Sequence, residues 1–235
     1  MQLAQLCQRA ERAFVGVPSG IMDQYVAVFG EPGSAIAIDC RGLTHQVVTL
    51  PPDVEIFAVN SMVKHDLAQS AYRERTEQCS AAVEAIRARY PAVSSLRDAD
   101  MTMLAGSSLP GTIGRRARHV IAEDERVGKF VAACGEGNLR MMGELFVESH
   151  RSLQFDYEVS SDKLDFLVDT AIGIEGVYGA RMTGGGFGGC TVNLLDKGAA
   201  AGFEREITCQ YQARFAVRPQ VYRCRASAGA SEIAA

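Results

Sequence analysis

The stretch from Arg181 to Cys190 holds the residues whose types and spacing point most directly to chemistry. Five of six consecutive residues in its middle are glycine; the six are Gly184, Gly185, Gly186, Phe187, Gly188 and Gly189. Because glycine loses more backbone entropy on ordering than any other residue, this cluster favours positive φ angles or close approach by another group. Successive backbone N–H groups in such a loop can bind an anion such as a phosphate. An ordinary tight turn between packed elements is the alternative that the pattern leaves open.

The surroundings of this glycine loop (residues 184–189) match neither of two common phosphate-binding motifs. A strand is predicted over residues 190–195, so the order is loop and then strand. The Rossmann fingerprint and the P-loop both run from strand to loop to helix. No lysine follows directly after the glycines, and no ribose-binding acid lies about 20 residues on in a βαβ unit. The sequence therefore indicates a different kind of glycine loop.

Three further side chains could take part in chemistry. Asp23 follows Ile21 and Met22 at the entry to a predicted helix, where it is either a partly desolvated general base or a solvated acid at a helix start. The Tyr72 hydroxyl could bind a polar ligand, although a tyrosine packed at a helix start is the commoner case. Glu11 could bind a divalent cation or lie on a solvated helical face.

Helices and strands must position these residues. We predict helices over residues 2–13, 21–29, 70–89, 115–134, 138–153, 162–171 and 199–215. We predict strands over residues 35–40, 45–50, 54–61, 190–195 and 220–224, the first two as a hairpin. The stretch from residue 90 to 112 is expected to be less ordered. The irregular alternation of helices and strands favours an α+β fold with an antiparallel or mixed sheet.

The composition limits the classes of function. A chain of 235 residues can form one large domain or two small ones, and its net charge of −4 argues against nucleic acid and anionic membranes as partners. No apolar run reaches the length of a membrane span, and the first residues lack the apolar core of a signal peptide. The seven scattered cysteines are expected to be reduced and mostly buried, as in a cytoplasmic protein. The four dispersed histidines suggest no metal site.

Six segments occur in a telling order: residues 20–24, 38–41, 72–79, 115–120, 148–150 and 182–190. This series resembles the galactokinases, members of the GHMP family of small-molecule kinases, over essentially the whole chain. The resemblance implies a two-domain α+β fold. Residues 1–52 would be the end of the GHMP kinase N-terminal domain, and residues 53–235 the C-terminal domain, a ferredoxin-like α/β sandwich. The active site would lie between the two domains.

The resemblance also implies an activity, the ATP-dependent phosphorylation of the C1 hydroxyl of galactose. Asp23 matches the catalytic base of the family, which also contacts the sugar. Gly20 and Tyr72 match sugar-contacting positions, and Glu11 matches the ligand of Mg²⁺. The glycine loop matches the motif beside the nucleotide phosphates. Galactose and ATP are thus the implied substrates, with Mg²⁺ as the implied metal.

Two motifs of the galactokinases are not found in this sequence: a Glu-His-Thr-Asp run for the sugar, and a loop rich in glycine and serine for ATP. We therefore expect the chain to be the C-terminal part of a galactokinase, with little activity alone and poor solubility from exposed apolar surface. Its partner would then be the N-terminal part, supplied as a separate chain. The alternative is a non-catalytic relative that acts as a binding or regulatory protein.

Overall fold

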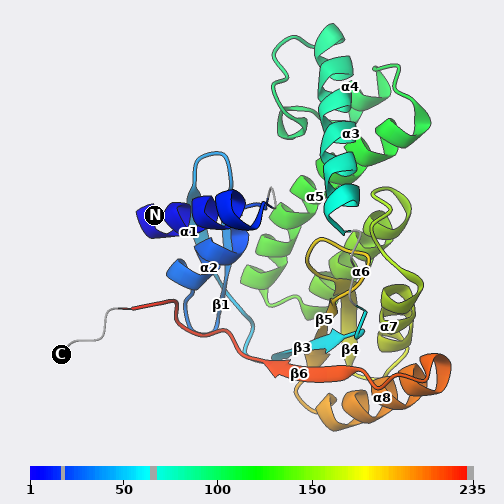
Figure 1. Cartoon of the computed structure of the whole chain (residues 1–235). Helices are drawn as coiled ribbons and strands as arrows, with labels where there is room; N and C mark the ends of the chain where they lie inside the picture. Colours follow the sequence, from blue (N-terminus) through cyan, green and yellow to red (C-terminus); the bar gives the residue numbers. More distant parts are fainter. Residues whose placement is uncertain (17–18, 64–67, 232–235) are drawn as a thin grey trace.

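A four-stranded antiparallel sheet forms the centre of the larger part of the molecule. The computed structural model describes residues 1–16, 19–63 and 68–231. The strands of this sheet are β3 (Val54–Asn60), β4 (Val177–Met182), β5 (Cys190–Asp196) and β6 (Gln220–Cys224). Their order is β4-β5-β3-β6, and all three pairings are antiparallel (Figure 1). The structure thus confirms the α+β class and selects the antiparallel alternative.

β4 is a strand that the sequence pattern does not predict. The strand contains Gly179, and its pairing with β5 shifts register between Val177 and Gly179. Glycine weakens the propensity signal of a strand interior and often marks a bulge. Gly179 is required here because α6 (Leu139–Phe155) crosses the strand closely: a Cβ on Gly179 would stand 2.1 Å from the Gly143 carbonyl oxygen.

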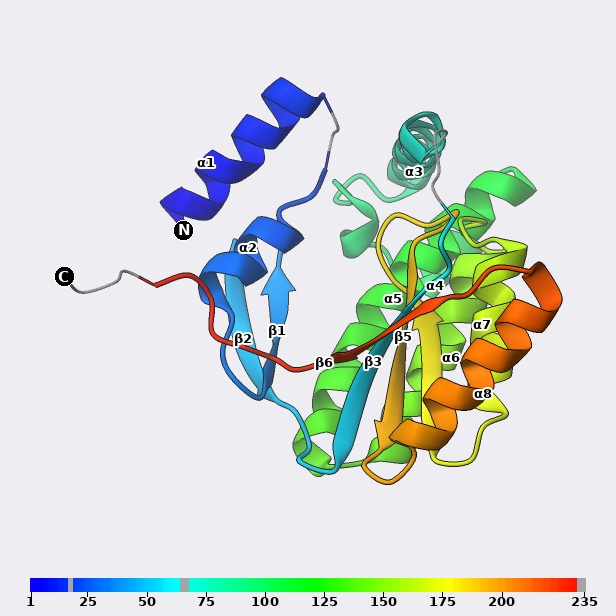
Figure 2. The ribbon, with the colours of Figure 1, turned by 60° about the horizontal axis from the view of Figure 1, so that its bottom comes forward.

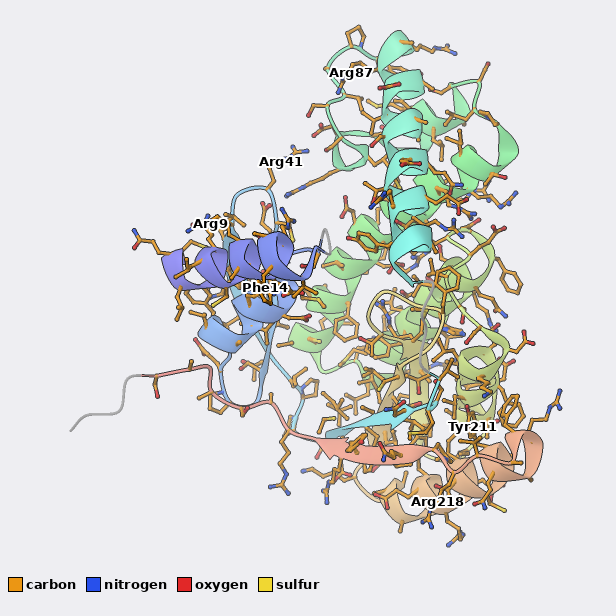
Figure 3. The ribbon with its side chains drawn as sticks, in the orientation of Figure 1. Arg9, Phe14, Arg41, Arg87, Tyr211 and Arg218 are labelled. Atoms are coloured by element: carbon orange, nitrogen blue, oxygen red, sulfur yellow. The ribbon has the colours of Figure 1, made fainter. Side chains whose placement is uncertain are left out.

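One face of the sheet is covered by α7 (Asp162–Ile172) and α8 (Ala200–Phe215). The core on this face has ten fully buried residues: Phe57, Val59, Leu167, Val168, Ala171, Ala180, Leu195, Phe203, Ile207 and Tyr211. The labelled Tyr211 points from α8 toward the sheet (Figure 3). The other face packs against α6 and the end of α5 (Gly111–Glu136), through Leu194, Met142 and Ala133.

α3 (Ala68–Arg89) and α5 extend away from the sheet and pack against each other (Figure 1). The stretch between them contains a short 3-10 helix (Leu96–Asp98) and α4 (Met101–Ala105), so the expectation of a less ordered stretch was wrong here. Side-chain caps explain the difference. Ser95 and Asp98 form a capping box, and Asp100 caps α4 by accepting from the Met103 N–H.

The first 52 residues form a smaller unit, which we call the N-terminal segment; residues 53–224 are called the sheet region. The N-terminal segment contains α1 (Gln2–Ala10), a π-helical turn (Glu11–Val15), α2 (Met22–Phe29) and a hairpin of β1 (Ser34–Asp39) and β2 (Thr44–Thr49). The predicted hairpin is confirmed. The predicted helix over residues 2–13 changes type at residue 11. The last described residues run beside α2, where the Gly229 N–H donates to the Gly30 carbonyl at 2.7 Å (Figure 2).

The cysteines differ from the expectation. Only Cys134 is buried, while Cys7, Cys40, Cys209 and Cys224 are exposed. All seven lie in the described ranges and none forms a disulfide there. In the same ranges, no helix combines the length and the apolar character needed to cross a bilayer.

Candidate functional site

The glycine loop closes the hairpin between β4 and β5. At its ends, the Thr183 N–H donates to the Cys190 carbonyl at 2.9 Å, and Ser61 donates from its N–H (2.9 Å) and Oγ (2.8 Å) to the Gly189 carbonyl. Ser61 is fully buried at the end of β3. The two ends of the loop are therefore fixed by the sheet itself.

The conformation of the loop requires its glycines. Gly184, Gly186 and Gly189 have φ angles of 79°, 93° and 79°. Such angles are readily adopted by glycine and disfavoured for other residues. Phe187 also takes a positive φ of 61°. The expectation of positive φ is confirmed, and the loop is at the same time the turn between two packed strands.

Close approach is the second reason for glycine, and here another part of the chain approaches. A Cβ on Gly186 would stand 2.2 Å from the Val159 carbonyl oxygen. The Phe187 N–H donates to that same oxygen at 2.5 Å. The exposed Gly184 and Gly185 N–H groups donate no hydrogen bond to any described residue. Exposed backbone donors of this kind can bind an anion.

Residues 156–159, which we call the 156–159 turn, are held by two buried arginines. Arg75, on α3, donates to the Tyr157 carbonyl at 2.7 Å and to the Glu158 carbonyl at 2.8 Å. Arg116, on α5, donates to the Asp156 carbonyl at 2.5 Å and to the Glu158 carboxylate at 2.6 Å. The glycine loop thus rests on a turn that is fixed by two helices.

The charges around this turn are matched by hydrogen bonds. The bond from Arg116, helped by one from Arg115, holds the pKa of the Glu158 carboxyl below its usual value. Burial is the largest cause that raises the pKa of the Tyr157 hydroxyl, whose ring stacks on His119 at 4.4 Å. Burial also lowers the pKa of His119 to about 3. The ring of His119 is therefore neutral at neutral pH.

Asp23 lies in the first turn of α2, in the N-terminal segment. Its side chain is exposed, so the alternative of a partly desolvated carboxylate is not what the structure shows. Ile21 is buried and Met22 is turned to solvent at 54% exposure, so neither shields Asp23. None of the described residues donates a hydrogen bond to the exposed Asp23 carboxylate.

Glu11 is linked to the same helix. The Gln24 amide, next to Asp23 in the chain, donates to the Glu11 carboxylate. Gly20 lies just before α2, is exposed, and has open space where a Cβ would stand. Tyr72 lies on α3 at 40% exposure, three residues before Arg75.

The predicted residues thus form two groups. Glu11, Gly20 and Asp23 share the N-terminal segment, while Tyr72 and the glycine loop share the sheet region. Through Arg75 and the 156–159 turn, the second group is one bonded structure. Across the described residues, no hydrogen bond or ion pair joins the two groups.

Comparisons with known proteins agree with this arrangement. The GHMP kinases C terminal family matches residues 130–213, and the GHMP kinases N terminal domain matches residues 1–31. A galactokinase of Roseiflexus sp. is 43% identical over 99% of this chain, and the human galactokinase is 46% identical over 88% of it. A crystal structure of Lactococcus lactis galactokinase complexed with galactose superposes with a TM-score of 0.92 and 33% identity over 98% of the chain.

The chain belongs to the galactokinase family of GHMP kinases. It covers 60% of the Roseiflexus relative, 53% of the human relative and 60% of the Lactococcus lactis chain. What it matches is the C-terminal portion of a galactokinase. Mevalonate kinase of L. major, at 15% identity and a TM-score of 0.56, shares the fold alone.

The family implies Mg²⁺, and the residues of this chain can be tested for it. No group of three or more His, Cys, Asp or Glu side chains capable of holding a metal exists among the described residues. Mg²⁺ usually keeps several waters and is bound by one or two carboxylates together with substrate phosphates. The partly exposed Glu11 carboxylate, oriented by Gln24, fits that mode as a single protein ligand.

Several residues that shape the site carry little or no recognisable signal in the sequence. Arg75 and Arg116 occur in segments that carry the galactokinase resemblance, but no role was assigned to them. Val159 and Ser61 carry no sequence signal, because their hydrogen-bond partners in the loop are 28 and 128 positions away. Gln24 adjoins Asp23 and could have been singled out by that adjacency.

Proposed function

We propose that this chain supplies the C-terminal part of a galactokinase, which transfers the γ-phosphoryl group of ATP to the C1 hydroxyl of galactose. The relatives of 43–47% identity named as galactokinases support this reaction. The observation in the chain itself that carries the proposal is the Gln24–Glu11 hydrogen bond, because it ties the candidate metal ligand to the residue that follows the candidate base in α2.

Asp23 is the proposed general base. Its exposed carboxylate accepts the proton of the C1 hydroxyl while that oxygen attacks the γ-phosphorus. Such a base contributes because the hydroxyl becomes a better nucleophile as its proton leaves. Phosphoryl transfer otherwise depends on positioning and on stabilising charge over the phosphoryl oxygens. Gly20, adjacent to α2 and free of side-chain bulk, leaves room for the sugar, and Tyr72 offers it a hydroxyl.

The glycine loop is the proposed phosphate-binding element. The Gly184 and Gly185 N–H groups would donate to phosphate oxygens, and glycine at each position keeps the approach unobstructed. Glu11 would hold Mg²⁺, which neutralises charge on the phosphates when bound. ATP and galactose are the proposed substrates. Residues 1–52 belong to the N-terminal domain and residues 53–235 to the C-terminal domain, and the reaction takes place between the two domains.

The test uses a chimera. The part of the Roseiflexus relative outside the matched region is fused in frame before Met1, and galactose-dependent ADP release and galactose 1-phosphate are measured. We expect turnover by the chimera and little by the 235-residue chain alone. Asp23→Asn should lower kcat by at least about 100-fold with the fold retained. Glu31→Gln, an exposed acid in the turn after α2, is the matched control and should leave kcat unchanged.

Two results would overturn parts of the proposal. An Asp23→Asn chimera with normal kcat would remove Asp23 from the role of base. A folded chimera that binds galactose but releases no ADP would favour the non-catalytic alternative, a binding or regulatory protein.

A further inference from the structure

The glycine loop packs directly on the 156–159 turn, and this contact sets the shape of the loop. The Val159 carbonyl oxygen accepts the Phe187 N–H at 2.5 Å and would lie 2.2 Å from a Cβ on Gly186. A shift of that oxygen by even a fraction of an ångström would alter the hydrogen bond in the middle of the loop. The ends of the loop are fixed by the sheet, and the Val159 carbonyl oxygen holds the middle through its bond with Phe187.

The turn needs outside support to keep its conformation. Glu158 has a φ of +54°, which is unfavourable for a residue with a side chain. Its neighbour Tyr157 is tied to α6 through a hydrogen bond from its N–H to the Ser152 carbonyl at 2.9 Å. The Asp156, Tyr157 and Glu158 carbonyls each accept a hydrogen bond from an arginine.

Both arginines are buried, which is unusual for their residue type. Arg116 is 2% exposed and Arg75 is 7% exposed. Gln78, on α3, connects them, since its Oε1 accepts from Arg116 Nε at 2.9 Å and from Arg75 Nη1 at 3.5 Å. The planar guanidinium presents several donors in fixed directions, so one arginine can hold two carbonyls or a carbonyl and a carboxylate. A lysine at either position keeps the charge but cannot make the same set of bonds.

We propose that Arg75 and Arg116 are positioning residues for the glycine loop, acting through the 156–159 turn. Arg75 also fixes the position of Tyr72 relative to the loop, because Arg75 and Tyr72 both lie in the first turns of α3. The sugar-side helix and the phosphate-side loop are thereby set by one bonded structure. The role of the loop in this proposal rests on the proposed function, whereas the structural coupling of the two arginines to the loop does not.

Hydrogen exchange in the 235-residue chain tests the coupling without any activity. We expect Arg116→Lys and Arg75→Lys to accelerate exchange of the Phe187 amide by at least about tenfold. The Phe57 and Val59 amides, in β3, should stay within about twofold of the unsubstituted chain. The control is Arg118→Gln on the same helix, which removes a contact with the Asp156 carboxylate but none with a carbonyl. It should leave the Phe187 amide unchanged.

Each outcome decides the coupling. Unchanged exchange at Phe187 in both lysine variants overturns it. Equal acceleration at Phe187 and in β3 also overturns it, because the arginines would then support overall stability only. An Arg118→Gln effect as large as that of Arg116→Lys would show that charge near the turn, and not the bonds to its carbonyls, controls the loop.

Kinetics of the chimera add a second readout. Arg116→Lys should raise KM for ATP by about tenfold and change KM for galactose by less than about twofold, since the Asp23 side of the site is untouched. Faster exchange at Phe187 with no change in KM for ATP would support the coupling of the two arginines to the loop and overturn the phosphate role proposed for the loop. The failure of the two proposals can thus be told apart.

Discussion

The N-terminal segment and the sheet region bury their apolar side chains very differently. In the sheet region, both faces of a four-stranded sheet are covered, and ten residues of the main core are fully buried. In the N-terminal segment, its own buried cluster consists of Ala4, Ile21 and Tyr25, and Val48 is buried against the sheet region. By contrast, Leu6 is 55% exposed and Phe14 is 95% exposed. Figure 3 labels Phe14 near the end of the first helical stretch.

Because of this difference in packing, the two parts of the candidate site stand on regions with cores of unequal size. The glycine loop, which must hold a defined shape, stands on the well-packed region. Asp23 and Glu11 stand on the segment with the smaller core, so their placement depends on what covers its exposed side chains. Burial of apolar surface is the main favourable term in folding, so we expect the two regions to differ in stability.

The largest effect is expected at the contact between α6 and β4. Gly143→Ala would place a Cβ 2.0 Å from the Tyr178 carbonyl oxygen, where both partners are backbone and neither can move alone. We expect the free energy of unfolding to fall by about 5 kcal/mol or more. Gly20→Ala, in the N-terminal segment, meets open space and should change it by less than about 0.5 kcal/mol. Urea denaturation followed by circular dichroism compares the two; similar losses would contradict the difference in packing.

A second pair of substitutions asks whether the two regions unfold together. Phe57→Ala removes a fully buried ring that packs on Phe203 at 5.6 Å, and should lower the free energy of unfolding by about 3–5 kcal/mol. Tyr25→Ala removes the ring that packs on Phe29 and His45 in the N-terminal segment. We expect it to speed proteolysis within residues 1–52 while the main transition stays in place. An equal loss in the main transition would mean that the chain unfolds as one cooperative unit.

Acid should affect the sheet region through His119. The pKa of this buried imidazole is lowered to about 3, from 6.5, chiefly by burial and next by Arg126. The folded state therefore binds fewer protons than the unfolded state, so stability is full above pH 6.5 and declines as the pH falls toward 3. Between pH 6.5 and 4.5 we expect a loss of about 2 kcal/mol.

His119→Gln should flatten this part of the profile of unfolding free energy against pH. A profile that keeps its slope in His119→Gln would assign the acid sensitivity to another group.

How well each element could be predicted from the sequence depends on whether its signal is local or comes from a contact with a distant part of the chain. Elements with a strong local signal were predicted with nearly correct bounds, such as α8 and the β1–β2 hairpin. β4 was missed because Gly179 serves a contact with α6, which no local pattern reveals. The helical turns between residues 96 and 105 were missed because their signal consists of single capping side chains, Ser95 and Asp100.

For the site, the glycine loop was the part best predicted from sequence. Positive φ is a property of the residue type, so Gly184, Gly186 and Gly189 could be interpreted directly. The reason for Gly186 could not, because it depends on a carbonyl 27 positions earlier in the chain, at Val159. The roles of Asp23, Gly20, Tyr72 and Glu11 come from the family resemblance and stay predictions.

The smallest effect is expected at the ion pairs that join the two regions. Arg97 pairs with Asp39, and Arg41 donates to Asp98 at 2.7 Å. The hairpin tip and the 3-10 helix thus each supply one arginine and one aspartate to these two ion pairs. Figure 3 shows Arg41 at the hairpin tip. The bond from Arg97 is the largest cause that lowers the pKa of Asp39, so the contribution of this pair is lost as acid protonates the carboxyl.

Because these groups are exposed, their effect on stability is small and salt-dependent. Arg97→Gln should raise proteolysis of the N-terminal segment slightly at low ionic strength, and the difference from the unsubstituted chain should vanish at about 1 M NaCl. The exposed Arg140→Gln, which removes an ion pair within α6, is the matched control. If Arg97→Gln instead loosens the N-terminal segment as much as Tyr25→Ala does, the segment is held mainly by its charges. The attachment of the N-terminal segment to the sheet region would then depend on these ion pairs and not on its small buried cluster.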